Sequence, residues 1–263
     1  MDLGLKGRAA IVAAASSGLG RATAMELARE GANVAINARD ETELMRSADE
    51  IREAAGVEAL AVAGDLTDEA SVRRLIAETK TRFGRVDILV ANAGGPPAGY
   101  FKDFTADDYR QAVELNLIST INLCREAVPH MRERGWGRIV AITSIAAKQP
   151  VENLILSNTA RAGVLGFMKS LSQQVAAEGI TVNTVCPGYH MTERLRKLGE
   201  LMAQNEGVTV EEIYARWAAM TPMKRIGQPH EFAALVAFLC SERASYLTGT
   251  VIQIDGGAYG ALF

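Results

Sequence analysis

Short apolar runs alternate with longer amphipathic stretches along this 263-residue chain. Apolar runs of this length are typical of strands buried on both faces of a sheet. They fall at residues 9–14, 34–37, 59–63, 87–91, 138–143, 181–186 and 251–254. Helical patterns between the runs imply right-handed βαβ crossovers and a parallel sheet. We therefore predict an α/β fold, with one doubly wound parallel sheet of about seven strands and helices on both faces.

Charge and composition argue against several kinds of partner. The formal net charge is −3 and the sequence has no basic run, which argues against nucleic acid. No stretch approaches the roughly 20 apolar residues of a membrane span, and no long apolar segment for export opens the chain. Cys124, Cys186 and Cys240 are widely separated, which suggests reduced thiols and no metal site. We expect a cytoplasmic protein without a membrane, metal or nucleic-acid partner.

A turn containing two glycines joins the first predicted strand to a helical pattern at 18–30. It reads AAASSGLG from Ala13 to Gly20. Glycines let the backbone approach a pyrophosphate closely, and the N-terminus of the following helix offers free N–H groups to it. This order of strand, turn and helix predicts a dinucleotide site.

Ala38 and Arg39 follow the second predicted strand. An acidic residue at position 38 would favour NAD, whereas alanine leaves room for a 2′-phosphate and arginine supplies a cation. The pair therefore predicts NADP(H). The alternative is a surface arginine beside the start of a helix.

Further motifs resemble those of the short-chain dehydrogenase/reductase family over nearly the whole chain. The turn is similar to that family's Thr-Gly-x-x-x-Gly-x-Gly, with Ala13 and Ala14 at the first two places. Asn92-Ala93-Gly94 and Pro187-Gly188 with Thr192 match two more of its motifs, and the subgroup most similar is the 3-oxoacyl-carrier-protein reductases. The resemblance implies a Rossmann fold and NADP(H) binding over a single domain of residues 1–263. The cofactor residues that it implies are Ala14, Ser16, Ser17, Gly18, Leu19, Gly20, Arg39, Asp65, Leu66, Asn92, Ala93, Gly94, Arg161, Pro187, Gly188 and Thr192.

The catalytic residues implied by the resemblance depart from the family pattern. Asn116 matches an asparagine that organises a proton relay, and Ser144 matches the serine that hydrogen-bonds the substrate carbonyl. Ser157 and Arg161 stand where the family has its catalytic tyrosine and lysine. A serine hydroxyl is a far weaker acid than a phenol, whose pKa is about 10, and a guanidinium stays protonated. Arg161 can still bind ribose hydroxyls and supply positive charge near the nicotinamide.

Three other side chains are candidate proton donors. Lys148 follows Ser144 by four residues, and Tyr189 and His190 follow Pro187-Gly188 at the nicotinamide end of the expected cleft. Each can donate a proton. Each also has a purely structural interpretation, as a solvated lysine, a packing tyrosine or an ordinary polar histidine.

Residues 189–228 break the alternation, with two helical stretches and no strand between them. Their methionines and leucines at helical spacing indicate packing, and their place after a strand's carboxyl end favours a lid over the substrate. The sequence does not identify the substrate beyond a small-molecule carbonyl or alcohol.

Three functions are consistent with these features. The first is an NADP(H)-dependent oxidoreductase, similar to 3-oxoacyl reductases, that interconverts a carbonyl and an alcohol with an atypical proton donor. The second is a catalytically impaired protein that binds NADP(H) as a sensor or partner subunit, and the third is a lyase or isomerase. The resemblance also implies a homotetramer or homodimer formed through helices at about 106–131 and 154–178 and the strand at 251–254.

Overall fold

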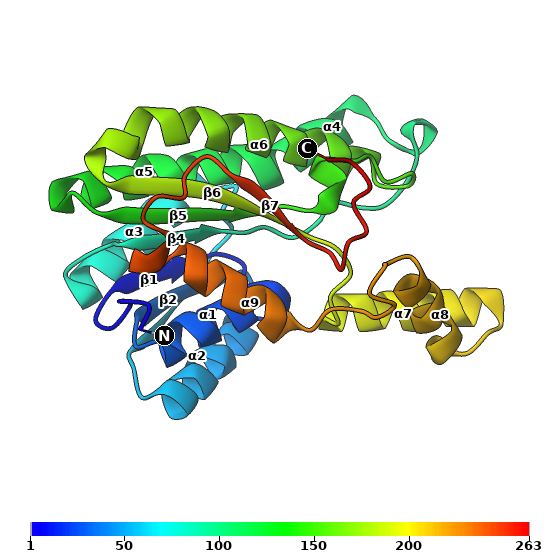
Figure 1. Cartoon of the computed structure of the whole chain (residues 1–263), viewed down its shortest axis with the longest axis horizontal. Coiled ribbons are helices and arrows are strands. Elements are labelled where there is room, and N and C mark those ends of the chain that lie inside the picture. The colour runs from blue at the N-terminus through cyan, green and yellow to red at the C-terminus, as the bar shows by residue number, and fades with distance from the viewer. Residues whose placement is uncertain (1, 263) are drawn as a thin grey trace.

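The computed structural model describes residues 2–262, and its seven strands form one parallel sheet (Figure 1). The strands are β1 (Ala9–Val12), β2 (Asn33–Ala38), β3 (Ala59–Ala63), β4 (Ile88–Ala91), β5 (Gly137–Ile142), β6 (Ile180–Pro187) and β7 (Val251–Ile254). They lie in the order β3-β2-β1-β4-β5-β6-β7. The chain moves outward from β1 to β3 and then returns to β4, so the direction of winding reverses between β1 and β4. Doubly wound sheets bind ligands at this reversal, beyond the carboxyl ends of the strands.

Two layers of helices cover the sheet. On one face lie α1 (Gly18–Arg29), α2 (Glu41–Ala55) and α9 (Pro229–Leu239), and on the other α3 (Glu69–Phe83), α5 (Ser119–Arg134) and α6 (Ile155–Val175). Side chains of one strand alternate between the two layers, so Val12 packs with the first group and Ile11 with the second. Both are fully buried, as expected for a sheet covered on both sides. The predicted fold class is confirmed.

The helix predicted at 106–131 is interrupted by an irregular turn. It consists of α4 (Ala106–Val113), a π-helical segment (Glu114–Ile118) and α5. Asn116 lies inside the π-helical segment, a geometry that is frequent at functional sites. The helix predicted at 154–178 is α6 followed by a 3₁₀ turn (Ala176–Glu178), and α9 was not predicted as a separate helix.

Two helices, α7 (Glu193–Glu206) and α8 (Val210–Ala219), project from the body of the molecule at the carboxyl side of the sheet (Figure 1). They occupy the segment predicted to be helical without a strand. Trp217 and Ile213 are at the centre of a small apolar cluster of their own. Backbone hydrogen bonds between Tyr189 and Gly227 (3.0 Å) and between Met191 and Gly227 (2.9 Å) tie together the two chain segments that lead into and out of these helices. In the part of the chain that the structure describes, no helix has the length and apolar character needed to cross a membrane.

Candidate active site

A cleft of about 540 Å³ lies beyond the carboxyl ends of the strands, on both sides of the point where the winding reverses. It is lined by every residue predicted to bind the cofactor except Gly188. Residues that line it but were not named as binding residues are Asn37, Ala38, Asp40, Gly64, Gly95, Leu115, Ser119, Ile142, Thr143 and Arg194. The sequence motifs, spread over 180 residues of the chain, therefore converge on one cavity.

The turn between β1 and α1 is tight because of close backbone packing. A Cβ atom on Gly20 would lie 2.4 Å from the carbonyl oxygen of Ala14, so only glycine fits there. Ala14 itself has φ +47°, in the left-handed region that alanine rarely adopts. The Asn92 side chain donates to the carbonyls of Ala13 and Ala14, each at 3.3 Å, and fixes the turn from the β4 side. The side chain of Ser17, the N-cap residue of α1, makes no capping hydrogen bond, so the first turn of the helix, which lines the cleft, lacks a side-chain acceptor for its N–H groups.

At the β2 end of the cleft, Arg39 is 79% exposed and its guanidinium lies 3.9 Å from the Asp65 carboxylate. Asp65 accepts hydrogen bonds from the backbone N–H and hydroxyl of Thr67, both at 2.9 Å. The N-cap of α3 is Asp68, so capping of that helix does not occupy Asp65. Arg39 and Asp65 remain available to a ligand.

At the β5 end, the Arg161 guanidinium is buried against the backbone. It donates to the carbonyls of Thr143 at 2.8 Å and Ile142 at 3.3 Å, where β5 ends, and to that of Ala93 at 3.4 Å. Burial, together with a smaller effect of the positive charge of Arg194, lowers the pKa of Arg161 to about 10. Arg161 therefore holds a positive charge at the cleft and links the ends of β4 and β5.

Ser144, Ser157 and Asn116 lie on three elements that pack together. Ser144 follows β5 and its hydroxyl accepts from the N–H of Ala146 at 3.1 Å. Helix α6, which carries Ser157 in its first turn, packs against the turn of Ser144 and against the π-helical segment of Asn116. The Ser157 side chain is buried, and its hydroxyl has no hydrogen-bond partner among residues 2–262. Asn116 donates to the carbonyl of Gly94 at 3.4 Å, and its Oδ1 is buried without a partner in the same range.

The three candidate proton donors have different surroundings. The Lys148 ammonium lies 4.6 Å from the centroid of the Tyr259 ring. Burial raises the pKa of the Cys186 thiol, and the positive charges of Lys148 and Arg161 oppose this with a smaller effect. Tyr189 stacks on Trp217 at 5.6 Å between ring centroids, and burial raises its pKa.

His190 is buried with its ring edge-on to Phe232, and burial lowers its pKa. The ring also has its Nδ1 3.2 Å from the carbonyl oxygen of Gly188. His190 and Tyr189 thus pack at the base of the projecting helices, whereas Lys148 lies near the end of β5.

Arg194 is the chief residue that the sequence analysis missed. It lies in the first turn of α7, two residues after Thr192, and its guanidinium lies against Gly95 across the cleft. The side chain of Thr192 caps α7 by accepting from Leu195, and its methyl group lies near Gly18. No motif predicts the contact of Arg194 with Gly95, because it depends on how α7 leaves the sheet.

Comparisons with known proteins show the family of the chain. A family model described as enoyl-(acyl carrier protein) reductase matches residues 13–259. A 3-oxoacyl-[acyl-carrier-protein] reductase of Aquifex aeolicus is 33% identical over 98% of this chain and 100% of that protein. The chain belongs to the short-chain dehydrogenase/reductase family.

Two solved structures extend the likeness to three dimensions. L-sorbose reductase from Gluconobacter frateurii, complexed with NADPH and L-sorbose, has a TM-score of 0.97 and 33% identity, with all of both chains covered. A variant of actinorhodin polyketide ketoreductase with NADPH has a TM-score of 0.90 and 36% identity, over 95% of this chain and 97% of that one. Both similar structures contain NADPH.

Proposed function

We propose that this protein is an NADP(H)-dependent reductase that interconverts a carbonyl and an alcohol, similar to 3-oxoacyl reductases, with an atypical proton donor. The observation that carries the proposal is the single cleft in which the predicted cofactor residues meet. Two of the similar structures are those of reductases with NADPH, which supports the same cofactor here.

The residues at the cleft fit NADP(H). The first turn of α1 would hold the pyrophosphate, because its N–H groups lack a side-chain cap and Gly18 and Gly20 would allow close approach. Arg39 would hold the 2′-phosphate, for which the small side chain of Ala38 leaves room. The cofactor, when bound, supplies the hydride for the reduction.

The protein's own residues orient the substrate and handle its charge. The Ser144 hydroxyl donates to the substrate carbonyl, and the buried Arg161 cation stabilises negative charge that develops on that oxygen. Lys148 lies on the turn that Ser144 begins and supplies the proton that the family's tyrosine would give. Tyr189 and His190 remain the alternative donors, although both are held in apolar packing. The helices at residues 189–228 cover the substrate as a lid.

The test is NADPH oxidation against a panel of ketones, aldehydes and acyl thioesters. The wild type is compared with Lys148→Met and with the double variant Ser157→Tyr/Arg161→Lys. Turnover by the wild type that falls about 100-fold or more in Lys148→Met supports both the reductase and its donor. Unchanged rates in Lys148→Met remove the lysine and direct the search to Tyr189 and His190.

A second function is favoured by the absence of a phenol at Ser157, whose hydroxyl has no partner within the described residues. In that case the protein binds NADP(H) as a sensor or as the partner subunit of an active relative. Activity of the double variant alone, with an inactive wild type that still binds NADPH, is the result expected for this function.

Association is a further part of the proposal. We propose a homotetramer or homodimer formed through α4 and α5, α6 and β7, as the family resemblance implies. Light scattering of the purified protein measures the mass of the assembly directly.

A further inference from the structure

Two guanidinium groups lie against the segment that follows β4. Arg194 comes from α7, and a Cβ atom on Gly95 would lie 2.5 Å from its Nη1 and 2.8 Å from its Nη2. Arg161 comes from α6 and donates to the carbonyl of Ala93 at 3.4 Å. This pair of cations lies toward the β5 end of the cleft, whereas Arg39 follows β2 at its other end.

Neither of the two cations has an acidic partner among the described residues. Within residues 2–262, no carboxylate lies within 4.0 Å of the guanidinium of Arg161 or Arg194. The acidic residue beside Arg194 on α7, Glu193, pairs instead with Lys197 at 3.7 Å. Arg194 also opposes the charge of Arg161, as the lowered pKa of Arg161 indicates. Arg161 is buried whereas Arg194 is exposed, so the repulsion falls mainly on the charge of Arg161, and an anion that contacts both guanidinium groups would relieve it.

We propose that Arg194 and Arg161 form an anion site that selects a carbonyl substrate bearing a carboxylate group. The proposal rests on the reductase function above and names its substrate class. The planar guanidinium of Arg194 suits a carboxylate because two parallel N–H groups meet two oxygens. The absence of a side chain on Gly95 is what leaves room for this guanidinium at the cleft.

The phosphate groups of NADP(H) are the other source of anionic oxygens. Other parts of the cleft suit these phosphates. The first turn of α1 offers its N–H groups to the pyrophosphate, and Arg39 lies at the adenosine end. Arg194 is therefore left over after the cofactor's own charges have been assigned.

The experiment measures binding and turnover with matched probes. The probes are 2-oxobutanoate, 3-oxobutanoate and 4-oxopentanoate, each beside its methyl ester, titrated calorimetrically into the protein saturated with NADP⁺. At least one acid is expected to bind the wild type about 10- to 100-fold more tightly than its ester. Arg194→Ala abolishes this preference while the affinity for NADP⁺ changes by less than about fivefold.

Two further variants separate the position of the charge from its presence. Arg196→Ala removes an arginine from the same helix at a place that does not line the cleft, so the preference for the acid remains. Gly95→Ala keeps the charge of Arg194 but pushes its guanidinium aside, and the preference decreases.

Each other outcome has a defined meaning. Equal binding of acid and ester by the wild type overturns the proposal. A loss of NADP⁺ affinity in Arg194→Ala with the acid preference intact also overturns it, and assigns Arg194 to a cofactor phosphate. Selective, Arg194-dependent binding of an acid without any NADPH oxidation leaves the anion site standing and removes the reductase function instead.

Discussion

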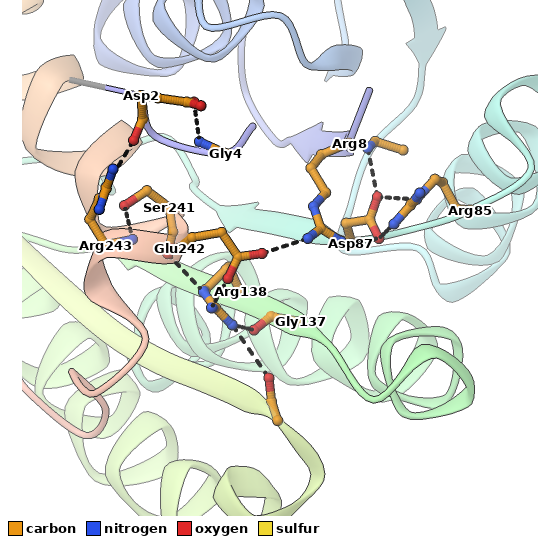
Figure 2. A network of polar contacts seen from close by, with 12 residues as sticks. Asp2, Gly4, Arg8, Arg85, Asp87, Gly137, Arg138, Ser241, Glu242 and Arg243 are labelled. Atoms are coloured by element: carbon orange, nitrogen blue, oxygen red, sulfur yellow. Dashed lines mark hydrogen bonds and ion pairs between the residues drawn. The ribbon is translucent and has the colours of Figure 1, made fainter. Parts of the chain in front are cut away.

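The parallel strands begin at one side of the sheet and end at the other, here called its amino edge and its carboxyl edge. A buried arginine lies at each of them, and the two have opposite surroundings. At the amino edge, where β5 begins, Arg138 is buried with an acidic partner, since its Nη2 lies 3.7 Å from Glu242 (Figure 2). At the carboxyl edge, where β5 ends, Arg161 is also buried, but within residues 2–262 its side chain donates only to backbone carbonyls. Removing one partner of a buried ion pair destabilises the fold because the other charge is left uncompensated, whereas a buried charge without a counter-ion is available to a ligand.

The amino edge is a closed network of charges. Arg138 also donates to the carbonyls of Gly137, Ser241 and Gly179. Two guanidinium groups lie over the ring of Trp136, that of Arg8 3.7 Å and that of Arg138 4.3 Å from the ring centroid. Burial lowers the pKa of Arg138, while the charge of Glu242 acts to raise it. This network links β1, β5 and the turn after α9.

The largest effect is expected at Asp87, which is fully buried just before β4. Its carboxylate accepts from the N–H of Ala9 at 2.8 Å and from Arg85 at 2.7 Å (Figure 2). Asp87→Ala leaves those donors unpaired and lowers the free energy of unfolding by about 3–4 kcal/mol. Urea denaturation measures the loss. Asp107→Ala, which breaks an exposed ion pair with Arg110, is the control and changes stability by less than about 0.5 kcal/mol.

Arg161→Met tests the carboxyl edge. We expect kcat/KM to fall about 100-fold, because the charge that stabilises the developing oxyanion is lost. The free energy of unfolding changes by less than about 1 kcal/mol, since removing an uncompensated buried cation offsets the lost hydrogen bonds to carbonyls. Steady-state kinetics and urea denaturation on the same preparation give both numbers. A stability loss above about 3 kcal/mol, without a specific loss of turnover, would make Arg161 a structural residue.

Arg138→Met is the matched substitution at the amino edge, with the same change of side chain and similar burial. Stability is expected to fall by about 2 kcal/mol, because three carbonyls lose their donor and Trp136 loses one of its two cations. Turnover per folded molecule stays unchanged, as the residue is on the opposite edge from the cleft. If turnover fell as far as in Arg161→Met, the distinction between the two edges would be wrong.

The sequence predicted the carboxyl edge better than the amino edge. The strand–turn–helix order of Ala13 to Gly20 and the residues after β2 and β4 follow recurring motifs, so their meeting in one cleft could be expected. The fold class followed from the alternation of apolar runs and helices. Asp87 and Glu242, by contrast, lie 155 positions apart in the chain, and no local pattern relates them.

Arg194 was not predicted for a related reason. Its contact with Gly95 depends on the direction in which α7 leaves the sheet, and a pattern of apolar spacing does not give that direction. The sequence also does not distinguish among the candidate proton donors. Lys148, Tyr189 and His190 all follow family motifs, and they differ only in their surroundings in the folded protein. Motif order thus predicted the cofactor cleft, and only tertiary packing distinguishes the residues that meet the substrate.

Ala14 lowers the stability of the carboxyl edge by a smaller amount, through backbone strain and not through charge. Its φ of +47° lies in the left-handed region, which costs a non-glycine residue about 1 kcal/mol. Ala14→Gly removes that cost, and the free energy of unfolding is expected to rise by about 0.5–1 kcal/mol even though glycine loses more entropy on folding. Ala13→Gly is the control one residue earlier, where φ is not positive, and is expected to lower stability by about the same amount. A loss of stability in both variants would show that the turn holds Ala14 without strain, and would leave the uncompensated charge of Arg161 as the main cost at this edge.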